Sequence, residues 1–253
     1  MSSITTALIV FACLFSSIMF GFFLRGVMPQ RHLDSDSKDI VKLATGLIAT
    51  LSALVLGLLV SSAKDSFNQV SNELMRTAVK VVQLDRILAQ YGPDAKEIRD
   101  LVKNGYSGAS ELMLSGDESQ QAQLDTPTAV ARIEGIQAKI RELSPQNDAQ
   151  RELRAHALQI SDELTGSRWL LILSLQGSVS TPLLVVLVFW LGLISTAWAV
   201  FSPRSLTVSV ALVACALSVS GAIFLILELD RPLTGLIKVS GAPVRAALSH
   251  LGE

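Results

Sequence analysis

Long uncharged apolar runs alternate with polar segments along this chain. Four such runs occupy residues 4–24, 43–63, 181–201 and 205–227. Each has about the 20 apolar residues that a helix needs to cross the hydrocarbon core of a bilayer. The first run has no basic residue before it and no small-x-small cleavage site after it, so we interpret it as a retained span and not as a signal peptide. The pattern therefore predicts four transmembrane helices arranged as two hairpins.

The second run differs from the others in its many small residues, which are Gly46, Ala49, Ser52, Ala53 and Gly57. Small residues allow helices in lipid to approach one another closely. We therefore expect this span to pack inside a helix bundle.

The polar stretch after the second run carries a repeat at helical spacing. Its members are Phe67, Val70, Leu74, Thr77, Val81, Leu84 and Leu88. Residues three or four positions apart lie on one face of a helix, so the repeat indicates a helix–helix contact. Since no glycine or proline lies between the second run and Gly92-Pro93, we expect one continuous helix from about Ile40 to Gln90 that projects well beyond the bilayer.

Shorter helical patterns fill the rest of the polar insert. We expect a helix from Asp94 to about Leu114, a polar loop over residues 115–123, and two helices that open at Thr126-Pro127 and Ser144-Pro145. In the last two, a hydroxyl that can cap the helix precedes a proline suited to the first turn.

Composition supports the fold class that the pattern indicates. The chain is 50% hydrophobic and 17% charged, with a mean hydropathy of +0.47, which is too apolar for an ordinary soluble protein of this length. We therefore expect an all-α membrane protein. Its predicted parts are a first transmembrane hairpin at 1–63, a helical extramembrane insert at 64–176 that continues span two, a second hairpin at 177–230 and a C-terminal tail at 231–253.

Candidate chemistry is sparse in this sequence. A net charge of −1, without a basic aromatic stripe, argues against a nucleic-acid partner. Cys13 and Cys215 lie inside apolar runs, which predicts buried free thiols. The sequence contains no GxSxG elbow, phosphate-binding glycine loop, metal-ligand pair or recognisable carboxylate frame. We expect no enzyme activity, cofactor, catalytic residue or metal site.

Two blocks of sequence carry a resemblance to a known family. The second span reads "KLATGLIATLSALVLGLLVSSAK", and the fourth ends in "LELDRPLTGLI", with "LSPQNDAQR" between them. Together these blocks resemble the bacterial bestrophin-like family of unknown function, which is similar to the bestrophin channels. The resemblance implies a homo-oligomer such as a pentamer, with membrane lipid and inorganic ions as its other partners. It also implies a bacterial inner-membrane protein whose insert and termini are cytoplasmic, an orientation that the nearly balanced charges at the span ends leave open.

The same resemblance identifies candidate pore residues on the second span. Matching along its Leu-Gly pair puts Thr50, Leu54 and Leu58 at the neck positions of bestrophins. Their i, i+4, i+8 spacing places them on one stripe of a helix, where the leucines could close a pore by dewetting. Plain helix packing is the alternative. The basic-Trp-Trp motif that follows this span in bestrophins is replaced here by "SFNQVSNE", so the identity of an ion is not implied.

The fourth span ends in two acids, Glu228 and Asp230, followed by Arg231 and Pro232; we call Glu228, Asp230 and Arg231 the acidic ending. These charges could simply mark the water interface. They could also pin the insert to the membrane part or bond a neighbouring helix N-terminus, as the resemblance to the bestrophin clasp implies. A ring of acids that concentrates cations at a pore mouth is a third interpretation.

Two functions therefore remain open from the sequence. The first is an oligomeric ion channel whose second span lines the pore, which requires a polar-tolerant face on that span. Hydroxyls that could supply this face are at Thr45, Thr50, Ser52 and Ser61. The alternative is a non-conducting membrane scaffold or sensor that acts through its helical insert and needs no such face.

Overall fold

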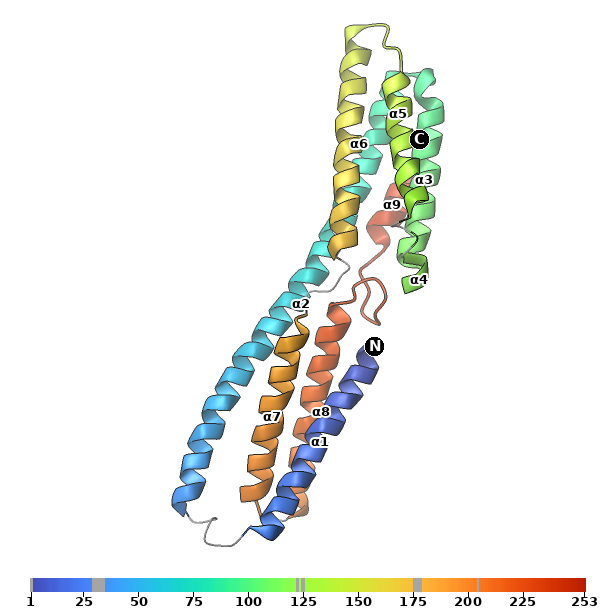
Figure 1. The fold of residues 1–253 in the computed structure, drawn as a ribbon. Coiled ribbons are helices and arrows are strands. Elements are labelled where there is room, and N and C mark those ends of the chain that lie inside the picture. The colour runs from blue at the N-terminus through green and yellow to red at the C-terminus, as the bar shows by residue number, and fades with distance from the viewer. Residues whose placement is uncertain (1, 29–34, 122, 124–125, 175–178, 204) are drawn as a thin grey trace. The chain divides into compact units, whose positions relative to one another are not determined.

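The computed structural model describes residues 2–28, 35–121, 123, 126–174, 179–203 and 205–253, and within these ranges the regular elements are all helices (Figure 1). The chain divides into two compact units. The first comprises Met1–Asp65 and Ser178–Asp230, and the second comprises Ser66–Gly177 and Arg231–Glu253.

The first unit contains the four apolar runs as helices. They are α1 (Ser3–Val27), the first part of α2 (Ser35–Tyr91), α7 (Thr181–Phe201) and α8 (Leu206–Leu229). All four are long and apolar enough to cross a membrane. The predicted fold class, an all-α membrane protein with four spans, is confirmed. The helix predicted from about Ile40 to Gln90 is also continuous, since α2 runs unbroken through that range.

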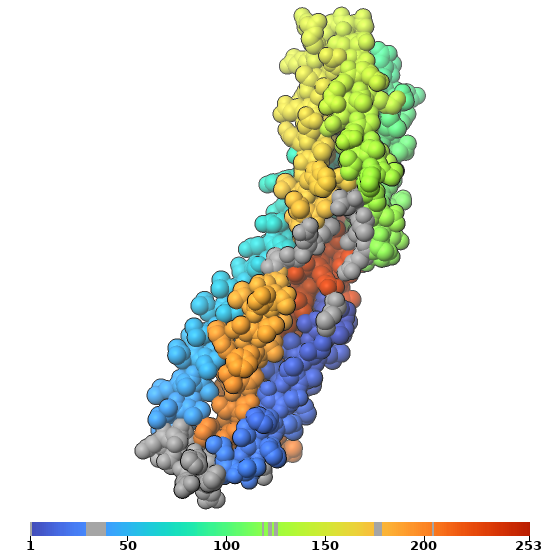
Figure 2. All heavy atoms as spheres, viewed as in Figure 1, coloured from blue at the N-terminus to red at the C-terminus, as the bar shows by residue number. Residues whose placement is uncertain are grey.

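Helix α1 packs along both α7 and α8, and its side chains lie against those of α7 in Figure 2. Their shared core consists of Val10, Leu14, Ile18, Ala199, Leu212, Ala216 and Ile223. At Gly21 the α7 backbone comes so close that a Cβ atom would lie 2.6 Å from both the Ala199 Cβ and the Thr196 carbonyl oxygen. In the same contact, the Thr196 hydroxyl donates a 3.1 Å hydrogen bond to the Ser17 carbonyl. Small residues therefore bring α1 and α7 together.

Helix α2 joins this unit through a narrower contact. Leu59 and Ala63 of α2 form a buried cluster with Leu187 of α7 and Ile226 of α8. Thr45 and Ser52, further towards the start of α2, are buried as well. Val55 and Leu56 flank this contact and are half-buried, whereas Leu54 and Leu58 are exposed in the described part of the chain.

The two cysteines are free, but the prediction that they are buried is wrong. Cys13 on α1 and Cys215 on α8 are both exposed on the surface of this chain. Apolar sequence around a residue does not distinguish a protein core from lipid, because in a membrane both environments are apolar.

The second unit is a helical bundle. It contains the remainder of α2, the short 3-10 helix η2 (Pro93–Ala95), α3 (Lys96–Leu114), α4 (Glu118–Gln121), α5 (Pro127–Glu142), α6 (Asp148–Ser174) and α9 (Ala242–His250). The predicted seam of α2 faces its core, where Val70, Leu74, Val81, Leu84 and Leu88 are buried. In Figure 1, α5 lies beside both α3 and α6, as their contacts require.

The starts of α5 and α6 differ in how well the sequence predicted them. Thr126 caps α5 as expected, since its hydroxyl accepts a hydrogen bond from the Ala129 N–H and Pro127 opens the helix. The predicted opening of α6 at Ser144-Pro145 is wrong, because α6 begins at Asp148. The Asn147 side chain accepts a 2.8 Å hydrogen bond from the Gln150 N–H and serves as the cap. The segment predicted as a polar loop also contains the short helix α4.

Residues 231–253 pack into the second unit, so the prediction of a separate C-terminal tail is wrong. Leu233, Val239 and Val244 are buried in one cluster with Val70 and Leu74 of α2. The segment before α9 folds on itself, with the Val239 N–H donating to the Pro232 carbonyl at 2.8 Å. The chain end therefore completes the core of this bundle.

Candidate functional site

The predicted pore residues lie on the exposed side of α2. Leu54 and Leu58 are 61% and 57% exposed, and Thr50 is exposed one turn earlier. Successive residues of a helix are rotated by about 100°, so these three positions point roughly opposite to the buried Ser52, Leu59 and Ala63. The described part of the chain therefore leaves the stripe of Thr50, Leu54 and Leu58 exposed.

The small residues of the second span are not all used inside the chain. Added Cβ atoms at Gly46 and Gly57 would meet nothing within 4 Å among the described residues. Both glycines lie on the same side of α2 as the pore candidates, by the same 100° rotation. The expected close packing of this span through its glycines is therefore absent between described parts of one chain.

The hydroxyls of the second span do not share a face. Thr50 and Ser61 are exposed, whereas Thr45 and Ser52 are buried within the unit. The Thr50 and Ser52 hydroxyls donate to the carbonyls of Gly46 and Ile48, four residues back, at 2.9 and 2.8 Å. Of these four hydroxyls, those of Thr50 and Ser61 lie on the exposed side of α2.

The acidic ending lies where the chain leaves the first unit. Glu228 is buried at 4% exposure in the last turn of α8, and Asp230 caps this helix. The Asp230 carboxylate accepts a 3.4 Å hydrogen bond from the Val179 N–H, just before α7. Asp230 therefore links the end of α8 to the segment that leads into α7, while Arg231 begins the turn that follows.

The second unit contains a charged cluster that no sequence pattern predicted. The Asp85 side chain on α2 is only 1% exposed, and the Arg99 guanidinium on α3 donates to both of its carboxylate oxygens, at 2.8 and 2.9 Å. Burial alone would raise the pKa of Asp85. Hydrogen bonds from Arg99 and from the Gly252 N–H, together with the charges of Arg99 and Arg86, outweigh burial and hold that pKa below its usual value.

The C-terminal residues complete this cluster. The Gly252 N–H reaches Asp85 at 3.3 Å, and Arg99 also donates to the Glu253 carbonyl at 3.0 Å. Arg86 pairs with the Glu253 carboxylate at 3.2 Å. Asp85 and Gly252 are 167 positions apart in the chain, so local spacing could not signal this contact.

No group of three or more His, Cys, Asp or Glu side chains within the described residues could hold a metal ion.

Four helices of membrane-spanning length, one of which continues into a helical bundle, define an all-α, four-span membrane protein. The chain belongs to the family described as the Bestrophin-like domain, which matches residues 10–244. The comparison with curated proteins gave no match.

Solved structures show the same fold. A Trp-to-Ala variant of a bacterial bestrophin homologue from Klebsiella pneumoniae is 14% identical, with a TM-score of 0.71 over 99% of this chain and 97% of the other. A Leu-to-Thr variant of that homologue is 13% identical, with a TM-score of 0.67 over 96% and 97%. An Ile-to-Thr variant is 14% identical, with a TM-score of 0.67 over 97% of each chain. At these identities the similarity concerns the fold.

Proposed function

We propose that this protein is an ion channel in which several copies of the chain surround a pore lined by α2. The observation that carries the proposal is the uncovered stripe of Thr50, Leu54 and Leu58, opposite the side by which α2 packs on its own chain. A pore helix in a homo-oligomer needs this division between a face that packs inward on its subunit and a face that points to the central axis. Membership of the Bestrophin-like family supports the same assignment.

In this proposal the two leucines form the constriction. Rings of Leu54 and Leu58 from neighbouring copies would make an apolar segment that blocks ions when it dewets. Thr50 and the exposed Ser61 would border it with hydroxyl groups. Gly46 and Gly57 would leave the α2 backbone open to the pore lumen.

The proposal also assigns the chain a membrane location and the acidic ending a structural role. The chain would lie in a bacterial inner membrane, with its four apolar helices in lipid and the second unit in the cytoplasm. The acidic ending of Glu228, Asp230 and Arg231 would hold the exit of α8 in place, as the hydrogen bond from Val179 to Asp230 suggests. A catalytic role has no part in this proposal.

Ion flux through liposomes that contain the purified protein tests the proposal. Leu58→Ala should increase the flux driven by an imposed ion gradient, because it removes the bulk of the constriction. Leu217→Ala on α8 is the matched control, since Leu217 is exposed to a similar degree and lies outside the proposed pore. Both variants should keep the oligomer size of the natural protein.

A protein that conducts no ions would favour the alternative, a membrane scaffold or sensor. If the folded oligomer passes no ions, and Leu54→Ala and Leu58→Ala change nothing, the stripe is a packing surface. The protein would then be a membrane scaffold or sensor that acts through its second unit.

A further inference from the structure

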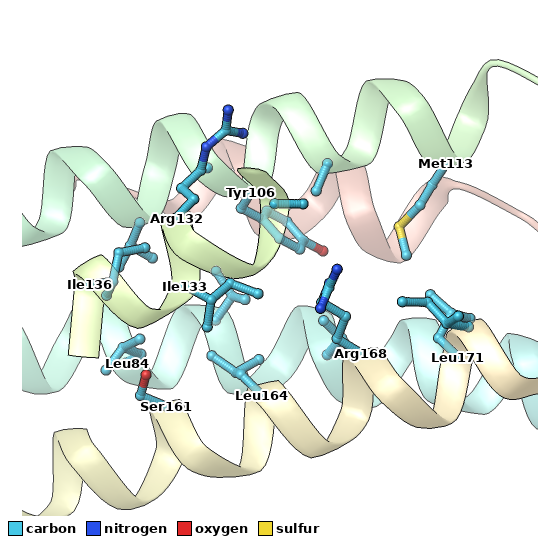
Figure 3. Close-up of a pocket in the computed structure, with 17 residues that line it drawn as sticks. Leu84, Tyr106, Met113, Arg132, Ile133, Ile136, Ser161, Leu164, Arg168 and Leu171 are labelled. Carbon is cyan, nitrogen blue, oxygen red and sulfur yellow. The ribbon is translucent and has the colours of Figure 1, made fainter. Parts of the chain in front are cut away.

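Helices α2, α3, α5 and α6 of the second unit line a cavity of about 170 Å³. Its wall is mainly apolar, and Leu84, Ile133 and Leu164 lie along it from three different helices (Figure 3). The cavity is partly open to the surface of the unit. An apolar cavity of about 150 Å³ in another protein stays dry and accepts benzene. The cavity here is therefore large enough for an apolar group about the size of one aromatic ring.

The polar group that distinguishes this cavity is the hydroxyl of Tyr106. Its oxygen is buried and has no hydrogen-bond partner among the described residues. Burial raises the pKa of Tyr106 to about 12, so the hydroxyl keeps its proton and can donate it in a hydrogen bond. A buried hydroxyl without a partner is unfavourable. An acceptor bound in the cavity would remove this penalty.

The charged groups around the cavity have one sign. Among its described lining residues, the charged ones are Arg132 and Arg168, and there is no carboxylate. In Figure 3 the Arg168 guanidinium points toward the hydroxyl of Tyr106, while that of Arg132 lies at the outer edge. A guanidinium beside a hydroxyl donor is a favourable environment for a carboxylate or a similar anion.

We propose that this cavity binds a small amphiphilic anion. Its apolar body would lie against Leu84, Ile133 and Leu164, and its anionic head would lie between Tyr106 and Arg168. A single-ring carboxylate and a short acyl carboxylate share this chemistry. The site belongs to the second unit alone, so it does not depend on whether the chain conducts ions.

Binding to the full chain in lipid nanodiscs tests this site. The probes are p-toluate and p-methylbenzylamine, which have the same ring and opposite charges, and hexanoate, which has an acyl chain in place of the ring. Ligand-observed NMR titrations give the affinities. We expect p-toluate to bind at least about tenfold more tightly than the amine. If hexanoate binds about as tightly as p-toluate, the site accepts acyl carboxylates. If hexanoate does not bind, the site is specific for carboxylates that carry a ring.

Variants of the lining locate the binding. Ala109→Leu should abolish saturable binding, because the added side chain fills the cavity. Arg168→Gln should weaken p-toluate binding at least about tenfold and should not weaken binding of the amine, because the variant removes a positive charge. If Arg168→Gln does not fold, Tyr106→Phe tests the same head site through loss of one donor. Arg141→Gln is the control, since Arg141 is on α5 and outside the lining.

Three results would each overturn the proposal. The first is a lack of saturable p-toluate and hexanoate binding to the natural protein. The second is equal affinity for the anion and the amine. The third is binding that persists unchanged in Ala109→Leu, because the ligand would then occupy another place or the lipid.

Discussion

The Arg99 guanidinium donates hydrogen bonds to both carboxylate oxygens of Asp85, at 2.8 and 2.9 Å. This pair joins α3 to α2, and the Gly252 N–H adds the C-terminal segment to the same carboxylate. Bidentate pairs of this kind are among the stronger hydrogen-bonded contacts in proteins. The C-terminal residues are therefore part of the bundle's structure.

The substitution Arg99→Gln should destabilise the second unit, because it leaves the Asp85 charge buried without its main partner. Breaking a fully buried pair costs about 3–5 kcal/mol, and the partial exposure of Arg99 reduces this to about 2 kcal/mol. The midpoint of thermal unfolding should then fall by roughly 4–8 °C, measured for the purified protein in detergent.

Lys139→Gln provides the comparison for Arg99→Gln. Lys139 on α5 pairs with Glu97 on α3 at 2.7 Å, but both side chains are substantially exposed. Exposed pairs contribute little to stability, so this variant should change the midpoint much less than Arg99→Gln. Equal midpoints for the two variants would contradict a special role for the buried pair.

The stabilisation by Asp85 should depend on pH. Its folded-state pKa lies below the ordinary value of 3.8, so the charged form favours the folded protein. This contribution is fully present above the ordinary pKa and is lost as the pH falls through the lower, folded-state pKa. The difference in thermal midpoint between the natural protein and Asp85→Asn should be constant near neutral pH and shrink in acid. If the difference between the two midpoints grew as the pH falls, the charged form of Asp85 would not be the form that stabilises the fold.

The buried Glu228 should matter more for the fold than its neighbour Arg231. Glu228 is almost inaccessible in the last turn of α8, whereas Arg231 is partly exposed and keeps part of its contact with solvent. Glu228→Gln should therefore lower the thermal midpoint or disturb the oligomer more than Arg231→Gln. Thermal melts and size-exclusion chromatography measure both effects. Equal midpoints and equal oligomer sizes for the two variants would refute this order.

Most of the fold could be predicted because its signals are local. Four apolar runs of sufficient length, and an apolar seam at helical spacing along α2, each depend on residues close together in the chain. The start of α6 was missed because Ser144-Pro145 and Asn147 both offer caps within a few residues. Local sequence alone does not decide which of these caps the folded bundle uses.

The candidate sites were less predictable for a physical reason. The stripe of Thr50, Leu54 and Leu58 followed from spacing and resemblance, but an apolar helix in lipid can expose or bury any face. The folded structure was therefore needed to show that this stripe is exposed. The contacts of Asp85 with Gly252 and the cavity beside Tyr106 join residues that are distant in sequence, and no periodic pattern marks them.

Two glycines in the apolar runs allow a direct comparison of packed and uncovered helix faces. At Gly21 on α1, an added methyl group would collide with the Thr196 carbonyl and the Ala199 side chain of α7. At Gly57 on α2, the same group would meet nothing within 4 Å in the described part of the chain. The first position is part of the internal packing, and the second faces whatever surrounds the chain.

Gly21→Ala should therefore destabilise the protein, and Gly57→Ala should not. Overpacking costs about 1–3 kcal/mol, because α1 and α7 must move apart to admit the methyl group at Gly21. In a helix, alanine is also more favourable than glycine by about 1 kcal/mol, so Gly57→Ala should leave the stability unchanged or raise it. Thermal melts of the two variants beside the natural protein give the comparison. A lower midpoint for Gly57→Ala would mean that another copy of the chain packs tightly against this face of α2. An unchanged midpoint for Gly21→Ala would contradict the close contact of α1 with α7.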